Sequence, residues 1–255
     1  MMLKLFAPLT AAFLPLVRGV TLPDAGMSND RLLPATYLLQ HEFIAQQLKG
    51  FARQHGWEQQ DATAVASMWS KHYLSLFSGG WLFARILYDT LLPADLKDLL
   101  LLLDADGQVT AVVVPDEGKP VAPVRTVEDF SVLFQQHIDA HFVALSAVTG
   151  VKAPVLWSNI ANGVEALRHL LSASGYLSPE KEQAIAALFT EKCWPDGARN
   201  LMYRSVFVRL SPDGEAVKLR KGCCLRYLLP EMGYCKNCCL PQAWQANYLP
   251  STTDN

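Results

Sequence analysis

The chain has 255 residues, of which 51% are hydrophobic and 18% charged, and its formal net charge is −2 at pH 7. A chain of this length and composition can form a hydrophobic core without disulfide bonds or other cross-links, and it is not intrinsically disordered. The cysteine distribution disfavours a disulfide scaffold, because such proteins are small and secreted, whereas here the first cysteine is Cys193 and the five others lie between residues 223 and 239.

The first twenty residues form an apolar segment that has some features of a signal peptide. Lys4 precedes a short apolar run, but Pro8 and Pro15 interrupt it, Arg18 closes it, and no clear cleavage site follows. The run is also shorter than the roughly 20 residues that a membrane span needs. We expect the segment to pack on the core, with peripheral contact with the inner membrane as the alternative. We place the protein in the cytoplasm, where thiols stay reduced.

Residues 35 to 92 have apolar side chains near helical spacing and predict three helices. Asp61 or Thr63 could cap the second helix. Residues 78–80 are expected to separate the second helix from the third, because two of them are glycine. The expected helices are Ala35–His55, with a stop between Gly50 and Gly56, then Ala64–Phe77, and then Trp81–Leu92, which Pro93 ends.

Two β-hairpins and three further helices follow. The hairpins are marked by alternating apolar residues on either side of turns that end in Gly107 and Gly214. Their strands are Leu99–Leu103 with Val109–Val114, and Ser205–Leu210 with Ala216–Leu219, and the helices are Phe130–Val148, Pro154–Leu171 and Pro179–Phe189. The predicted fold class is α+β. We expect a helix-rich body at 1–198, which could bind substrate, and a hairpin with a C-terminal metal lobe at 199–255, joined in one integrated domain.

Five cysteines after the second hairpin define the main candidate site. Four of them are spaced as C-C-x10-C-x2-C, namely Cys223, Cys224, Cys235 and Cys238, and Cys239 follows directly. Because the chain needs no cross-links to fold, so dense a group of cysteines favours metal binding over disulfide bonds. Four thiolates suit zinc or an iron–sulfur cluster.

The spacing alone does not decide between these two metals. Structural zinc sites usually pair two separate C-x2-C turns, and this sequence has one. Adjacent cysteines on an extended strand point to opposite faces, so the backbone must bend, and Gly222 permits a bend there. A wider target such as a two-iron cluster relaxes that demand. The chemistry therefore favours iron–sulfur modestly, and zinc stays open.

Positive charge is concentrated around the cysteines. From residue 199 to 239, eight basic residues face three acidic ones, a net charge of +5 in a chain whose total is −2. The basic residues are Arg199, Arg204, Arg209, Lys218, Arg220, Lys221, Arg226 and Lys236. Such a rim could attract an anionic partner, or it could offset the charge of the thiolates and their metal.

The segment CCLRYLLPEMGYCKNCCL resembles the C-terminal signature of the FhuF family of ferric-siderophore reductases, whose cysteine motif binds a [2Fe-2S] cluster. Three upstream segments are similar to that family in the same order: 66–73, the hairpin 101–114, and 156–159. The resemblance implies that Cys223, Cys224, Cys235 and Cys238 are the cluster ligands. Cys239 has no assigned role.

The resemblance implies a ferric-siderophore reductase that uses its [2Fe-2S] cluster to reduce the Fe(III) chelate by one electron and releases Fe(II) in the cytoplasm. Arg220, Lys221 and Arg226 are the candidate contacts to an anionic chelate. The sequence has no G-x-G fingerprint and no P-loop, so we expect an external electron donor such as a ferredoxin, a flavodoxin or a small reductase. We expect no nucleic-acid partner. The alternative is a non-enzymatic binding module that carries zinc or an iron–sulfur cluster.

The remaining reactive or aromatic residues have simpler interpretations. His137 and His141 stand four residues apart, a spacing that can bind metal, but no third ligand is evident and surface histidines are common. Asn159 could cap or orient a loop. The other two expectations concern burial: Cys193 as a small buried hydrophobe, and Trp69, Tyr73, Trp81 and Trp157 as core residues rather than a stacking platform.

Overall fold

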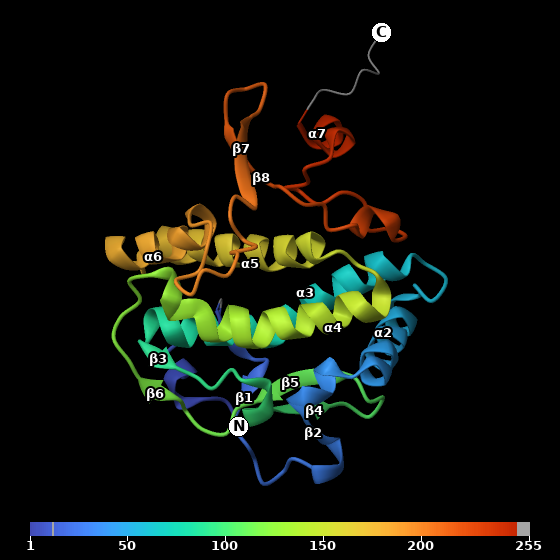
Figure 1. Cartoon of the computed structure of the whole chain (residues 1–255), viewed down its shortest axis with the longest axis vertical. Coiled ribbons are helices and arrows are strands. Elements are labelled where there is room, and N and C mark those ends of the chain that lie inside the picture. The colour runs from blue at the N-terminus through green and yellow to red at the C-terminus, as the bar shows by residue number, and fades with distance from the viewer. Residues whose placement is uncertain (12, 249–255) are drawn as a thin grey trace.

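The computed structural model describes residues 1–11 and 13–248. Three helices cross the middle of the molecule: α3 (Ala62–Leu87), α4 (Asp139–Thr149) and α5 (Ala153–Ala173). A small sheet lies on one side of them, and a hairpin with the C-terminal helix lies on the other (Figure 1). The predicted α+β class is confirmed.

The sheet beside the N-terminus has the strand order β1-β5-β4-β2. Its strands are β1 (Val20–Thr21), β2 (Leu32–Pro34), β4 (Leu100–Leu103) and β5 (Val109–Val113), and only the β1–β5 pair is parallel. The first predicted hairpin, β4–β5, is thus confirmed as the centre of a larger sheet. A second pair joins β3 (Thr90–Leu91) to β6 (Lys119–Pro120). The short strands at both edges carried no sequence signal.

Helix α3 runs without interruption through the glycines that were expected to break it, so that prediction was wrong. The two glycines instead admit the N-terminal chain to the helix surface. A Cβ atom on Gly79 would stand 2.4 Å from the carbonyl oxygen of Leu16, and one on Gly80 would stand 2.6 Å from the Val20 side chain. Gly19 faces the helix in the same way, 2.3 Å from the Leu76 carbonyl. Close packing outweighs the modest helix cost of glycine.

The N-terminal segment packs on the core, as expected. Leu3, Phe6 and Phe13 are buried, and the short helix α1 (Leu14–Val17) lies against α3. The terminal ammonium donates hydrogen bonds to Thr21 Oγ1 and to the Leu22 carbonyl. Within the described residues, no helix combines the length and the apolar character that crossing a bilayer requires.

The other helices agree in position with the prediction and differ at their ends. The expected first helix is divided into a 3-10 turn, Ala35–Leu39, and α2 (His41–His55), which ends at Gly56 in the left-handed conformation with φ 69°. Its third-turn glycine, Gly50, stays helical beside Gln108. The expected 130–148 helix begins as a π-helix, Val132–Ile138, and continues as α4. Helices α5 and α6 (Pro179–Thr190) begin at or next to the expected prolines.

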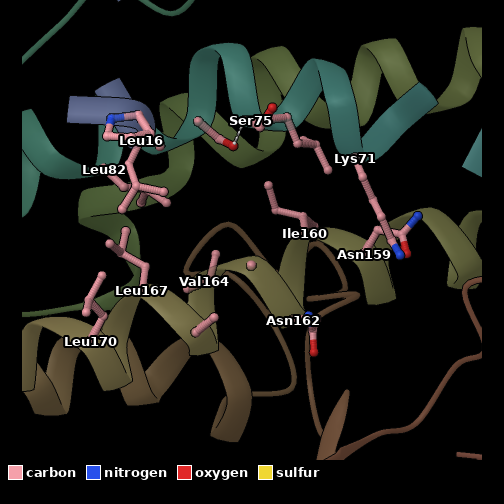
Figure 2. Close-up of a pocket in the computed structure, with 16 residues that line it drawn as sticks. Leu16, Lys71, Ser75, Leu82, Asn159, Ile160, Asn162, Val164, Leu167 and Leu170 are labelled. Carbon is pink, nitrogen blue, oxygen red and sulfur yellow. Dashed lines mark hydrogen bonds between the residues drawn. The ribbon is translucent and has the colours of Figure 1, made fainter. Parts of the chain in front are cut away.

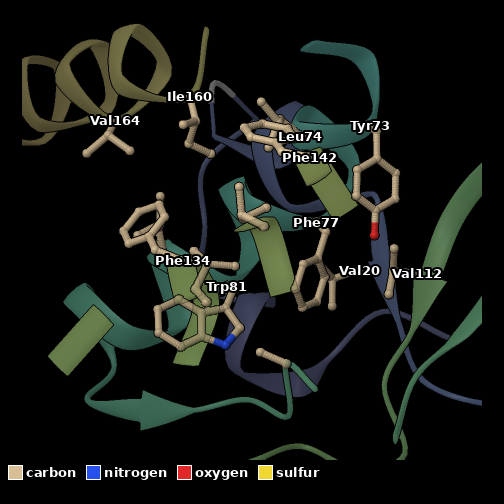
Figure 3. Close-up of a cluster of buried hydrophobic side chains, with 14 of the residues drawn as sticks. Val20, Tyr73, Leu74, Phe77, Trp81, Val112, Phe134, Phe142, Ile160 and Val164 are labelled. Carbon is tan, nitrogen blue, oxygen red and sulfur yellow. The ribbon is translucent and has the colours of Figure 1, made fainter. Parts of the chain in front are cut away.

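Aromatic side chains from α3 fill the centre of the molecule (Figure 3). Tyr73, Phe77 and Trp81 are buried together with Phe134 and Phe142, which face them. The expectation that Trp69, Tyr73, Trp81 and Trp157 are core residues is confirmed.

His137 and His141 are fully buried among these aromatics, so their expected place on the surface was wrong. His137 Nδ1 lies 2.8 Å from the Ala94 carbonyl oxygen, which can only accept, and therefore Nδ1 carries the proton. Nε2 then accepts from the Tyr73 hydroxyl at 2.7 Å. Burial lowers the pKa of His137 to about 3 and that of His141 to about 4. Both side chains are neutral parts of the core.

Candidate metal centre

A hairpin delivers the chain to the cysteines, as predicted. Strands β7 (Val206–Leu210) and β8 (Ala216–Arg220) pair in antiparallel register and project from the helical layer (Figure 1). At the base of the hairpin, the Lys221 amide donates to the Ser205 carbonyl. The Arg220 amide donates to the Asn237 carbonyl at 3.0 Å. The second bond ties the C-x2-C turn to the end of β8.

The four cysteines of the motif come together in one small lobe. Cys224, Cys235 and Cys238 are buried side by side, and Cys223 packs against them half-buried. The Sγ atoms of Cys224 and Cys235 are 3.8 Å apart. Helix α7 (Pro241–Tyr248) closes the lobe with Ala243. All six cysteines of the chain are free thiols.

The backbone bend at the adjacent cysteines lies at Leu225, not at Gly222. Leu225 has φ 61° and ψ 2°, a left-handed conformation that is strained for a leucine, and its N–H points at Cys223 Sγ at 3.3 Å. Gly222 serves a different purpose, because a Cβ atom there would stand 3.0 Å from the Ser158 side chain. It lets the chain approach α5. The strained conformation of Leu225 therefore orients its amide toward the sulfur of Cys223.

The cysteines differ in acidity because their surroundings differ. The pKa of the Cys224 thiol is lowered to about 4, mainly by a hydrogen bond with Cys235 and in addition by the charges of Lys71 and Arg220. Burial raises the pKa of Cys223 to about 11. Cys235 has a raised pKa because it shares its proton with the Cys224 sulfur. The Cys224 thiolate is thus favoured before any metal binds, mainly by the hydrogen bond with Cys235 and to a smaller extent by the two neighbouring cations.

The donor set fits a cluster that takes four thiolates. All four sulfur donors come from two loops of one lobe, at positions 223–224 and 235–238. In the part of the chain that the structure describes, no three His, Cys, Asp or Glu side chains are close enough together to hold a single metal ion.

Below the cysteines lies a buried polar network that the sequence did not reveal. Arg220 is 1% exposed, and its guanidinium donates to Asn159 Oδ1 at 2.7 Å and to the Gly222 carbonyl at 2.8 Å. The Asn159 amide in turn donates to Ser67 on α3, whose hydroxyl donates to the Cys224 carbonyl at 2.8 Å. Asn159 therefore orients the cysteine loop from α5, which agrees with its expected role.

Lys71, on α3, lies close to the thiol of Cys224. It lines a cavity of about 390 Å³ between α3 and α5, where its side chain points toward Asn159 (Figure 2). Burial lowers the pKa of the Lys71 ammonium, and the neighbouring Cys224 sulfur opposes that effect. The segment 66–73 contributes Ser67, Ser70 and Lys71 to the site. Its helical pattern placed these residues on α3, but nothing in it showed that they face the cysteines.

The three expected substrate contacts occupy different environments. Lys221 is exposed beside the cysteines. Arg226 is partly buried and donates to the Met232 carbonyl, so it braces the loop between the two cysteine pairs. Arg220 is enclosed by protein and does not reach the surface rim where it was expected, because α5 supplies its hydrogen-bond partners. The prediction for Cys193 was also wrong: Cys193 is exposed and forms an isolated antiparallel β-bridge with Arg199.

The family models that match this chain describe one class, iron reductases with a 2Fe-2S domain. A family model described as "Ferric iron reductase FhuF-like transporter" matches residues 67–218, more than half of the chain. A second, described as "FhuF 2Fe-2S C-terminal domain", matches residues 220–240. The chain belongs to the FhuF family, and its C-terminal segment is a [2Fe-2S] domain.

One curated relative is the ferric siderophore reductase of Escherichia coli (strain K12), which is 26% identical over 178 residues. The match covers 69% of this chain and 65% of the relative, so the chain spans about two thirds of that protein. Two solved structures of aerobactin synthetase IucA from a hypervirulent pathotype of Klebsiella pneumoniae, one ATP-bound, have TM-scores of 0.53 and 0.52 at 13% and 12% identity. They cover 68% and 74% of this chain and 37% of each synthetase chain, and show a shared fold alone.

Proposed function

We propose that this protein is a ferric-siderophore reductase, in which one electron converts the Fe(III) of the chelate to Fe(II), which then dissociates. The observation that carries the proposal is the gathering of Cys223, Cys224, Cys235 and Cys238 in one lobe at an end of the molecule, in a chain of this family. Siderophores hold Fe(III) through hard oxygen donors, which bind Fe(II) more weakly. Reduction therefore loosens the chelate.

We assign the four cysteines as the ligands of the cluster. A bound [2Fe-2S] cluster supplies transfer of one electron at a time. Cys223 is the half-buried member of the set, so it is the most solvent-accessible of the four proposed ligands. The Leu225 amide and the buried cations beside Cys224 favour negative charge at these sulfurs. The protein thus positions the donor and sets its electrostatic surroundings.

A surface beside the cysteines could receive a bulky chelate without enclosing it. Tyr227 and Tyr234 stack with ring centroids 5.6 Å apart and are both exposed, on the loop between the two cysteine pairs. Exposed Lys221 and Lys236 flank that loop. An anionic chelate would be drawn to this basic, aromatic surface. The proposed contacts are now Lys221 and the two tyrosines, with Arg226 bracing their loop.

The electron comes from a separate donor protein in this proposal, because the sequence has no dinucleotide-binding fingerprint. A ferredoxin, a flavodoxin or a small reductase would serve. We also keep the cytoplasm as the proposed compartment, since the site depends on free thiols.

The proposal is tested by anaerobic mixing of chemically reduced protein with ferric siderophores and an Fe(II) trap. We expect the visible absorption to recover as the protein is reoxidised, with trapped Fe(II) matching the protein oxidised. Hydroxamate, catecholate and carboxylate chelates should be compared. A protein that stays reduced with all three would favour the alternative, a cluster-bearing binding module without reductive turnover.

A further inference from the structure

Arg220 carries a buried positive charge for which none of the described residues supplies an opposite charge. Across residues 1–11 and 13–248, no carboxylate forms an ion pair with its guanidinium. Its partners are all neutral: the Ser158 hydroxyl at 3.2 Å, the Asn159 amide oxygen, and the Gly222 carbonyl. Other arginines of the same segment, such as Arg204 and Arg209, are exposed to solvent. Arg220 is not.

A buried charge without a counterion is costly, and proteins normally pair it. The buried arginine of the helical body shows the usual solution, because Arg85 contacts Asp129 at 2.6 Å. Arg220 is equally enclosed, and its positive charge favours the thiolate form of Cys224, Cys235 and Cys239 in the lobe. Cys224 lies four residues along the chain, and its carbonyl and that of Gly222 are held by the same network.

We infer that Arg220 is the buried counterion of the cysteine-bound cluster and raises its reduction potential. Four thiolates and a [2Fe-2S] unit carry net negative charge, which increases when an electron is added. A fixed positive charge in a poorly screened interior favours the more negative, reduced form. Asn159 and Ser158 on α5 hold the guanidinium in place, so they are positioning residues for that charge.

The inference rests on the ligand assignment proposed above and is independent of the siderophore. The potential is measured on the loaded protein without substrate, so failure here would leave the reductase proposal intact. The reverse also holds, because a protein that reduces no chelate can still have a potential that depends on Arg220.

The test is a redox titration of holo variants, followed by visible absorption and by the electron paramagnetic resonance signal of the reduced cluster. Arg220→Gln removes the charge and should lower the equilibrium constant for reduction at least tenfold, a shift of about 59 mV to lower potential for one electron. Arg220→Lys keeps the charge and should stay nearer the wild-type midpoint. Lys236→Gln is the control, since it removes an exposed charge next to Cys235 that solvent screens.

A second variant covers the case in which Arg220→Gln fails to load a cluster. Asn159→Asp leaves the arginine in place and puts a carboxylate at the position of the present 2.7 Å contact. The new carboxylate should neutralise the charge of Arg220, and the reduction potential of the cluster should fall as it does in Arg220→Gln. Loading of Arg220→Lys but not of Arg220→Gln would support the requirement for charge. The inference would be overturned if the midpoint potential of Asn159→Asp or Arg220→Gln moved no further than that of Lys236→Gln. It would also be overturned if Arg220→Lys lost the cluster, or if its midpoint potential shifted as far as that of Arg220→Gln.

Discussion

The molecule contains two buried polar sites that are organised in opposite ways. In the helical body, His137 and Tyr73 are neutral and satisfy each other, with the Ala94 carbonyl accepting the remaining proton. In the cysteine lobe, Arg220 is charged and makes hydrogen bonds to neutral groups only. The first site is electrically complete. The second has an excess positive charge that polar neighbours orient but do not cancel.

This difference indicates which part of the protein can fold by itself. The body buries a continuous aromatic core around α3 and needs nothing added (Figure 3). The apolar cluster of the lobe consists of three cysteines and Ala243, with Cys223 and Leu240 against it. Such a core supplies little hydrophobic stabilisation, so we expect binding of the cluster to contribute to the folding of the lobe. The division at residue 198 remains a proposal, and the experiments below probe it.

Removing one proposed ligand should give the largest effect, confined to the lobe. We expect Cys235→Ser to purify without the visible absorption of a [2Fe-2S] cluster, because serine replaces a buried thiolate ligand. Cys239→Ser is the matched control and should keep the full iron content and spectrum. Iron analysis and absorption spectra decide this. A colourless Cys239→Ser protein would show that the ligand assignment is wrong.

Acid should destabilise the body through its neutral histidines. Because burial lowers the folded-state pKa of His141 from 6.5 to about 4, the unfolded chain binds more protons between these values. Stability is therefore fully present above pH 6.5 and is lost as the pH falls toward 4, with a slope of about 1.4 kcal/mol per pH unit for each such histidine. Urea unfolding of the wild type and of His141→Phe should differ in this slope. Equal slopes would mean that His141 is protonated in the folded protein.

The close approach of the N-terminal segment to α3 should be measurable as stability of the body. Gly79→Ala places a methyl group 2.4 Å from the Leu16 carbonyl, and we expect a loss of about 1–3 kcal/mol of unfolding free energy from overpacking. Gly163→Ala on α5 is the control, since nothing lies within 4 Å of its added Cβ. It should gain up to about 1 kcal/mol from helix propensity. A Gly79→Ala protein as stable as Gly163→Ala would contradict the packing shown here.

The smallest expected effect concerns the surface of the lobe. Lys221→Gln should slow reduction of an anionic chelate by a factor of about two to five at low ionic strength, since one exposed charge contributes weakly and is screened by salt. Stopped-flow rates with an uncharged chelate provide the control and should not change. An equal loss for both chelates would indicate a structural defect.

The sequence predicted the elements better than their contacts. Hairpin turns at Gly107 and Gly214 were evident because turn chemistry is local. The uninterrupted α3 was not evident, because Gly79 is tolerated owing to its contact with Leu16, which lies 63 residues earlier in the chain. The cysteine motif gave the cofactor class through its family. The burial of Arg220 could not be foreseen, since its partners on α5 are recognisable only after folding.

The contrast between the cysteine lobe and the helical body is tested most directly by hydrogen–deuterium exchange. The exchange is measured on the holo protein before and after a chelator removes the cluster. We expect amides between residues 219 and 248 to lose protection when the charge that balances Arg220 is removed. Amides of α3 and α4 around Tyr73 and His141 should keep theirs, because apolar packing holds that core together without a metal. Unchanged protection in the lobe, or an equal loss in both regions, would contradict the account.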